Sequence, residues 1–358
     1  MAAFHDDHDH RSGMPGWFLV LSLVGGTFLF FRYFGVAGLD HISIYQKERR
    51  VSSDQEFISY NQTSTFPPTV NFVGTSDVIA DDPFADALKV AETVVPRRRV
   101  RNIRIASWAL DGFTPSKLAN PIARQNLMRV IRQFDIIALQ QIASVERDIV
   151  PRLADAANEA GRNYDYIIGQ QTGPADQSEQ LAFIFDVNRV KTDRKQTYTV
   201  ADPDNQILYD PLVAWFRAAQ PPSSQAWTFS VVNVRIDLVR APQEVALMPG
   251  IMSAVRLDGR GEDDVVMAGL FQADDEYLLP TIAGEATRAA VRSVPTDIFG
   301  RHQTANIVMD TKMTSEYIGR GGAFDFLRVY NLSAAEAETV TSHLPVFAEF
   351  TATEGGEL

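Results

Sequence analysis

Hydrophobic and polar positions follow regular patterns over roughly the last two-thirds of the chain. The run IRIASWAL at 103–110 alternates its side chains between two faces and predicts a β-strand. A helix is expected next, because Asn120 is a good N-cap and Pro121 suits a first turn. The run FDIIALQ at 134–140 is nearly continuous in apolar residues, which is typical of a strand buried on both faces.

Similar apolar runs recur towards the C-terminus. They are YDYIIG, LAFIFD, LVAWFRA, TFSVVNVRIDL, DDVVMAGLF, NIVMD and LPVFAEF. Helical stretches and long loops separate them, and Pro249 followed by Gly250 is expected to cut one helix between about 243 and 257. Many strands with interspersed helices predict an α/β domain with large sheets over residues 101–351, followed by a tail at 352–358.

The N-terminal part of the chain has a different pattern. Residues 16–39 are mostly apolar and about long enough to span a bilayer, and Arg32 lies near enough to one end to reach the headgroups. We therefore expect a transmembrane anchor, with the membrane as a partner. A cleaved signal peptide is the alternative, weakened by the acidic HDDHDH within the preceding tail, 1–15. Basic residues after the segment predict a single-pass membrane protein whose large domain is cytoplasmic.

A polar linker is expected at residues 40–100. Within it, Asp82 and Pro83 begin a short amphipathic helix near 83–94. The arginine-rich string PRRRVRNIR follows at the domain boundary. It is either a contact for anionic lipid headgroups or a solvated charge cluster.

Composition narrows the possible functions. The 358-residue chain has a formal net charge of −12, which disfavours broad nucleic-acid binding because the phosphate backbone is also negative. It contains no cysteine, which excludes disulfides, thiolate metal sites and cysteine nucleophiles.

The ordered motifs carry a more specific signal than composition. IRIASWALDGF, FDIIALQQI, SEQLAFIFD, DPLVAWFR, FSVVNVRIDL, DDVVMAGLFQAD, TANIVMD and TSHLPVFAEF follow one another along the chain. In this order they resemble the endonuclease/exonuclease/phosphatase superfamily, the fold of pancreatic deoxyribonuclease. The resemblance implies a four-layered α/β sandwich, two packed β-sheets flanked by helices. It also implies a magnesium-dependent cleft for phosphodiesters or phosphomonoesters.

The resemblance breaks at most of the site positions. Glu179, Arg217 and His343 match the family pattern, and Glu179 and His343 would be remnants of its catalytic machinery. At seven positions the family's polar or catalytic residue is replaced, namely at Ala109, Gln141, Arg235, Leu270, Gln272, Ala305 and Ser342. The resemblance makes Gln141 the replacement of a metal-binding glutamate. It makes Ser342 the replacement of the acid that would pair with His343.

These replacements predict a weak or absent metal site. Magnesium prefers carboxylate oxygens, so we expect no cofactor and no metal ligand, and His343 is expected to lack an acidic partner. The leading interpretation is therefore a pseudoenzyme that acts as a binding or scaffolding module. An unknown protein or a phosphate-bearing ligand would be its partner. The alternatives are an active metal-dependent phosphodiesterase, nuclease or phosphatase with a rearranged site, and a purely structural envelope component.

Three outcomes are open for the arginines of this site. Arg217 and Arg235, with His343 and the amides Gln141 and Gln272, could bind an anion directly. Alternatively, Arg235 fills the space of the lost metal and pairs with Glu179. The glutamate could also form a buried pair with Arg217.

Overall fold

The computed structural model describes residues 101–144, 146–282, 284 and 286–356. Its strands are β1 (Ile103–Ala109), β2 (Ile136–Ile142), β3 (Tyr164–Thr172), β4 (Glu179–Asp186), β5 (Val190–Thr192), β6 (Tyr198–Thr199), β7 (Leu212–Ala218), β8 (Thr228–Arg235), β9 (Val265–Leu270), β10 (Thr287–Ala289), β11 (Ala305–Asp310), β12 (Tyr317–Ala323) and β13 (Val346–Phe350). One sheet has the order β12-β13-β1-β2-β4-β3. The other has the order β10-β11-β9-β8-β7-β5, with β6 paired to β7. Both sheets are mixed, because β1 runs parallel to β2 and β8 parallel to β9, while the other pairs are antiparallel.

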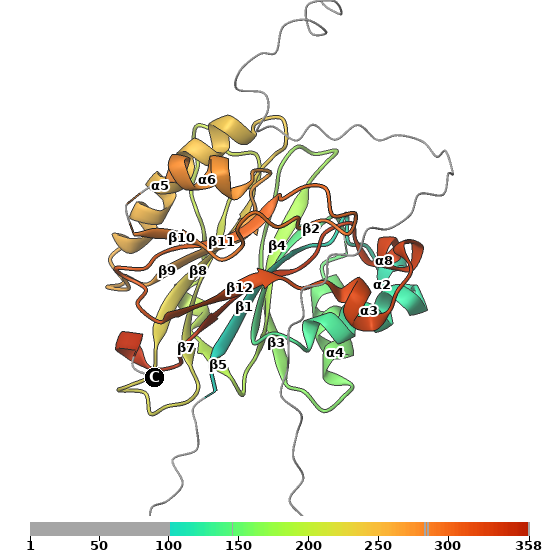
Figure 1. Ribbon diagram of the computed structural model, residues 1–358, viewed down its shortest axis with the longest axis horizontal. Helices are drawn as coiled ribbons and strands as arrows, with labels where there is room; N and C mark the ends of the chain where they lie inside the picture. Colours follow the sequence, from blue (N-terminus) through green and yellow to red (C-terminus); the bar gives the residue numbers. More distant parts are fainter. Residues whose placement is uncertain (1–100, 145, 283, 285, 357–358) are drawn as a thin grey trace, which may run out of the picture. The chain divides into compact units, whose positions relative to one another are not determined.

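Helices cover the outer faces of the two sheets. They are α2 (Pro115–Ala119), α3 (Pro121–Ile131), α4 (Ile149–Asn158), α5 (Ala241–Arg256), α6 (Asp275–Ile282), α7 (Phe326–Tyr330) and α8 (Ala334–Val340), with 3-10 turns η1 (Arg194–Gln196) and η2 (Glu354–Gly356). Helices α2, α3, α4, α7 and α8 pack on the β1 sheet, and α5 and α6 pack on the β8 sheet (Figure 1). Helix α3 begins as expected, since the Asn120 side chain accepts hydrogen bonds from Ile122 N and Ala123 N.

A continuous apolar core lies between the two sheets. Its largest members are fully buried aromatic side chains, and Trp227 stacks on Phe229 with ring centroids 3.8 Å apart. Phe216 of β7 makes an edge contact with Phe183 of β4 in the other sheet, and their ring centroids are 5.7 Å apart. Apolar burial on this scale is the main stabilising contribution to such a sandwich. The predicted α/β sandwich of two packed sheets with flanking helices is therefore confirmed.

The predicted break at Pro249 is wrong. Helix α5 continues through Pro249 from Ala241 to Arg256, although proline removes one N–H donor from the helix and normally breaks it. Met248, Ile251 and Val255 are buried against the β8 sheet on either side of the proline. Burial of this face outweighs the local cost of the missing hydrogen bond.

Residues 352–356 pack on the domain, although the sequence suggested a tail beginning at residue 352. Trp227 N donates to Ala352 O at 3.0 Å, and Gly355 N donates to a carboxylate oxygen of Glu316 at 2.7 Å. The chain after β13 is thus held against the ends of both sheets.

None of the helices in the described part of the chain is long and apolar enough to cross a membrane. The longest, α5, has 16 residues, whereas a span needs about 20 apolar ones, and it covers a sheet. This finding contradicts the predicted single-pass membrane localisation with its cytoplasmic domain, and we do not retain it. The predicted tail 1–15, anchor 16–39 and linker 40–100, with its helix near 83–94, lie outside the described residues.

Candidate functional site

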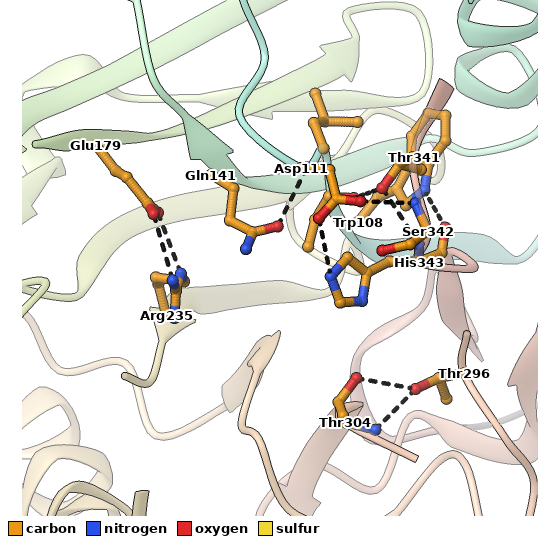
Figure 2. A network of polar contacts seen from close by, with 12 residues as sticks. Trp108, Asp111, Gln141, Glu179, Arg235, Thr296, Thr304, Thr341, Ser342 and His343 are labelled. Carbon is orange, nitrogen blue, oxygen red and sulfur yellow. Dashed lines mark hydrogen bonds and ion pairs between the residues drawn. The ribbon is translucent and has the colours of Figure 1, made fainter. Parts of the chain in front are cut away.

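Most of the predicted site residues meet at one end of the two sheets, which we call the cleft end. Strands β1, β2, β8 and β9 end there, and β4 and β13 begin there. Figure 2 shows two groups at this end, the Glu179–Arg235 pair and the side chains around His343, with Gln141 between them.

Arg235 and Glu179 form a nearly buried ion pair. Arg235 Nε lies 3.1 Å from Glu179 Oε2, and Nη2 lies 3.3 Å from Oε1, so the contact is bidentate. The two side chains are 9% and 13% exposed. The Arg235 guanidinium also lies over the ring of Tyr209, 4.7 Å from its centroid, and donates to the Ile236 carbonyl. The interpretation that Arg235 pairs with Glu179 is confirmed.

The pKa of Glu179 shows how strongly the charged form of this residue depends on Arg235. Burial raises the pKa of Glu179, while the charge and hydrogen bonds of Arg235 lower it, and the net direction is upward. The glutamate therefore tolerates its charge at this site chiefly because Arg235 is present. Both carboxylate oxygens point at the guanidinium, so the group is poorly available to any other cation.

His343 has an acidic partner, contrary to expectation. Its Nε2 lies 3.5 Å from Oδ1 of Asp111, which follows β1 in a turn (Figure 2). Asp111 Oδ2 accepts from the backbone N–H of Ser342 at 2.9 Å. Burial would raise the pKa of Asp111, but the contacts with His343 and Ser342 lower it further than burial raises it. Asp111 thus supplies the acid that Ser342 lacks.

The orientation of this pair differs from that of a catalytic pair. In a catalytic Asp–His arrangement the acid holds Nδ1 and leaves Nε2 free for the reacting group. Here Asp111 occupies the side of Nε2. The Nδ1 of His343 is buried without a hydrogen-bond partner among the described residues. The imidazole is fixed in place, but its proton-transfer nitrogen is not presented to an open site.

Gln141 and Gln272 both stand at strand ends in left-handed backbone conformations. Gln141 has φ of 60°, and its Oε1 accepts from Asp111 N at 3.1 Å. Gln272 has φ of 54°, and its backbone N–H donates to Thr304 O at 2.9 Å. Gln141 therefore supports the turn that carries Asp111.

Three of the replaced positions belong to the core rather than to a cleft surface. Ala109, Leu270 and Ala305 are 1%, 0% and 3% exposed and pack in the apolar cluster between the sheets. Leu270 and Ala305 are direct partners in the β9–β11 pairing. Leu270 is sealed from solvent because it packs in the apolar core between the two sheets.

Arg217 does not join the other predicted site residues. It pairs with Thr228 and Lys191 in the β8 sheet, whereas Arg235 stands at the opposite end of β8. Its Nε is buried without a hydrogen-bond partner among the described residues. Arg217 therefore forms no pair with Glu179 and no joint anion site with Arg235 and His343.

A pocket of ≈ 480 Å³ opens beside the Glu179–Arg235 pair. Its lining consists of polar and charged side chains with two alanines, namely Ala143, Ser144, Gln171, Ala175, Asp176, Gln177, Ser178, Glu179, Tyr209, Arg235 and Asp237. Three carboxylates face one guanidinium in this pocket. The charge balance is unfavourable for a phosphate group.

The donor set at the cleft end does not fit a magnesium ion. Magnesium is bound through one or two carboxylates with near-octahedral geometry. The Glu179 carboxylate is paired with Arg235, and the Asp111 carboxylate is paired with His343. The side chains of Leu270 and Ala305 contain no oxygen and are buried. Within the described residues, acidic groups close enough to share an ion occur only elsewhere, around Asp264. The described residues of the cleft end therefore do not provide the ligand set that a magnesium ion requires.

Sequence reasoning missed Asp111 and Tyr209. Asp111 and Gly112 follow the first predicted strand, and Asp-Gly is a common turn pair because both residues tolerate positive φ. That signal could have placed a carboxylate at the end of β1. For Tyr209, which stands in the loop before β7, the sequence offers no comparable signal.

Comparison with known proteins finds similarity to curated deoxyribonucleases. No family model matches the chain. Deoxyribonuclease gamma from Rattus norvegicus is 27% identical over 265 residues, covering 68% of this chain and 83% of that protein. Deoxyribonuclease-1 from Ovis aries is 23% identical over 265 residues, covering 68% of this chain and 98% of that protein.

Among solved structures, the chain is similar to an endonuclease/exonuclease/phosphatase family protein from Bacteroides thetaiotaomicron. The identity is 14%, the TM-score is 0.49, and the match covers 70% of this chain and 94% of that one. The curated relatives, the mixed two-sheet sandwich and the ordered motifs confirm the resemblance of the chain to the endonuclease/exonuclease/phosphatase superfamily, with a deoxyribonuclease-I-like fold.

Proposed function

We propose that this domain is a non-hydrolysing member of its superfamily that acts as a binding or scaffolding module. The observation that carries the proposal is the Glu179–Arg235 ion pair. The Arg235 guanidinium contacts both carboxylate oxygens of Glu179, at 3.1 and 3.3 Å. The family resemblance assigns this carboxylate to catalysis. A divalent cation would have to displace a nearly buried arginine, at a cost of several kcal/mol.

The apolar replacements support the same proposal. Leu270 and Ala305 contribute to the core between the sheets, and each is replaced at a position where the resemblance implies an aspartate. Losing groups that act as a unit typically lowers the rate by orders of magnitude. The remaining His343 faces Asp111 through the wrong nitrogen for proton transfer to a ligand.

The pocket beside the ion pair is a candidate binding surface for the module. Its excess of carboxylates does not favour the phosphate-bearing ligand that the sequence suggested. We therefore expect no binding of inorganic phosphate or a nucleotide at millimolar concentration. Saturable binding that is lost in Arg235→Met would contradict this.

The Asp111–His343 pair is the observation that favours the alternative, an active metal-dependent phosphodiesterase, nuclease or phosphatase with a rearranged site. The deciding experiment measures hydrolysis of bis(p-nitrophenyl) phosphate, p-nitrophenyl phosphate and plasmid DNA with Mg²⁺ or Mn²⁺. We expect the full-length protein and His343→Ala to be indistinguishable from buffer. Turnover that disappears in His343→Ala would establish the alternative.

Restoring one acid is a stricter test. Ser342→Asp places a carboxylate next to His343, at the position where the family resemblance expects it. We expect no measurable activity from this variant, because the carboxylates at 141, 270 and 305 are still missing. Metal-dependent cleavage of plasmid DNA by Ser342→Asp alone would show that the site is nearly intact.

A further inference from the structure

A second pocket lies on the helix-covered face of the first sheet, near the start of β1. Arg104 reaches it because its neighbours Ile103 and Ile105 point into the core between the sheets, and successive side chains of a strand alternate between its faces. The pocket has a volume of ≈ 400 Å³, which is within the range of ligand sites. We call it the arginine pocket, and it is lined by Gln133, Tyr330 and five arginines, Arg101, Arg104, Arg129, Arg132 and Arg162.

Two of the guanidinium groups are held in place by aromatic rings. Arg104 lies over Phe134 and Phe347, 5.1 and 4.7 Å from the ring centroids. Arg129 lies 3.7 Å from the ring centroid of Tyr330, whose hydroxyl donates to the Arg129 carbonyl at 2.9 Å. Side chains that are already ordered lose little conformational entropy when they bind a ligand. These contacts therefore favour binding of an anion in the pocket.

The positive charge of the arginine pocket is largely uncompensated. Its lining contains no acid, and within the described residues only Arg104 among its arginines forms an ion pair, with Glu349 at 3.2 Å. Arg132 donates to backbone carbonyls at the end of α4, which gives it a structural role. The guanidinium groups of Arg101 and Arg162 make no hydrogen bond in the part of the chain that the structure describes.

The arginines also repel one another. Burial and the nearby charge of Arg101 lower the pKa of Arg104, while Glu349 and Asp135 raise it, and the net direction is downward. Such a concentration of positive charge stands out in a chain whose formal net charge is −12. An anionic ligand would relieve this repulsion, and the local positive field would attract it.

We propose that the arginine pocket docks a short segment of a partner protein that is rich in aspartate and glutamate. Guanidinium groups bind carboxylates with paired hydrogen bonds, and arginine clusters recognise acidic motifs. Five guanidinium groups spread around ≈ 400 Å³ fit several separate carboxylates better than one small anion. A long nucleic acid is disfavoured, because its backbone would extend beyond the pocket over an acidic protein.

Docking at this place leaves the cleft end accessible. Strand β1 begins at the arginine pocket and ends at the cleft end, where His343 precedes β13. The proposal therefore holds whether or not the cleft end hydrolyses phosphate esters. A failure of the peptide to bind would leave the proposed loss of hydrolysis untouched.

The test measures the fluorescence anisotropy of a fluorescein-labelled peptide of alternating aspartates and glutamates, about six residues long, titrated with the full-length protein. We expect saturable binding in about 50 mM NaCl that weakens at least about tenfold in about 300 mM NaCl, because salt screens exposed charges. Arg101→Gln and Arg162→Gln should each weaken binding about threefold, and the double variant about tenfold. Both residues are exposed, so these variants should fold normally.

The matched control is Arg240→Gln, which removes an exposed arginine between β8 and α5, at the cleft end. It changes the net charge by the same amount and should bind the peptide as the unchanged protein does. The arginines at 97–99 are common to all variants and cancel in the comparison. A peptide with asparagine and glutamine in place of the acids should not bind.

Three results would overturn the proposal. The first is the absence of saturable binding by the unchanged protein. The second is that Arg101→Gln and Arg162→Gln bind as tightly as the unchanged protein, or lose no more affinity than Arg240→Gln. The third is displacement of the labelled peptide by an oligothymidylate of about 12 nucleotides at a lower concentration than the unlabelled peptide requires, which would mean that the pocket prefers a phosphate backbone.

Discussion

The two ends of the sheets differ in the partners of their buried carboxylates. At the cleft end, Glu179 is held by Arg235 and Asp111 faces His343, so each acid has a basic neighbour within 3.5 Å. At the opposite end, Asp264, which precedes β9, and Glu316, which precedes β12, are more deeply buried, and their hydrogen-bond donors are neutral groups. Both ends are acidic by residue count, but only the second lacks compensation within the described chain.

The difference shows why the number of carboxylates does not by itself locate a cation site. An acid that is already paired gains little from a metal, because the metal must first displace the partner. An unpaired buried acid gains the full benefit of a counter-ion. In this molecule the acids at the cleft end are paired with basic groups, whereas burial and neighbouring acids raise the pKa values of Asp264 and Glu316 at the other end.

The largest expected effect comes from breaking the cleft-end ion pair. Arg235→Met keeps most of the side-chain volume but leaves Glu179 nearly buried without its partner. We expect the free energy of unfolding to fall by about 3 kcal/mol, because removing one member of a buried pair leaves an uncompensated charge. Urea unfolding at neutral pH measures this loss directly.

The double variant Glu179→Gln/Arg235→Met is the matched control. It also removes the Glu179 charge, which is left without a partner in the single variant. The double variant should therefore recover a large part of the lost stability. If the single and double variants unfold at the same urea concentration, the pair does not stabilise the cleft end.

A smaller, pH-dependent effect is expected from Asp111→Asn. The pKa of Asp111 is depressed in the folded state, so its contribution to stability is present above its unfolded pKa of about 4 and is lost as the pH falls below that value. The side chain is 38% exposed, and solvent screening limits the contribution to about 1 kcal/mol. The variant should therefore be less stable than the unchanged protein at pH 5.5.

Unfolding curves between pH 2.5 and 6 test the sign of this effect. The stability difference between the two proteins should shrink steadily as the pH is lowered from about 4. A difference that is constant over this range would mean that Asp111 acts only through its turn and not through its charge.

Much of the fold could be predicted from sequence because its strands are apolar runs with clear ends. The runs at 103–110 and 134–140 became β1 and β2, and Asn120 capped α3 as its residue type suggests. The helix through Pro249 was missed, because local propensity cannot show how much apolar surface a sheet will bury. The four-layered arrangement came from the order of motifs rather than from any single one.

The candidate site was only partly predictable. The pairing of Arg235 with Glu179 could be anticipated as one alternative, because both residues stand at positions of the resemblance. Arg217 was misplaced because β7 runs antiparallel to β8, which carries its last residues away from the cleft end. Asp111 reaches His343 from 232 positions away along the chain through a turn with φ of 51°, and no periodicity in the sequence encodes that contact.

The smallest expected effect is a gain in stability at Asp264 and Glu316, at the end of the sheets opposite the cleft end. Glu316→Gln removes a buried acidic charge that acts on Asp264. We expect the free energy of unfolding to rise by about 0.5–1 kcal/mol at pH 8. The matched change at the cleft end, Glu179→Gln, should lower stability, because it leaves Arg235 nearly buried without its counter-charge. Opposite signs for two Glu→Gln changes in one protein, measured by the same urea titration, would establish that the two ends differ in charge compensation. If both changes destabilise, Asp264 and Glu316 are compensated as the acids of the cleft end are.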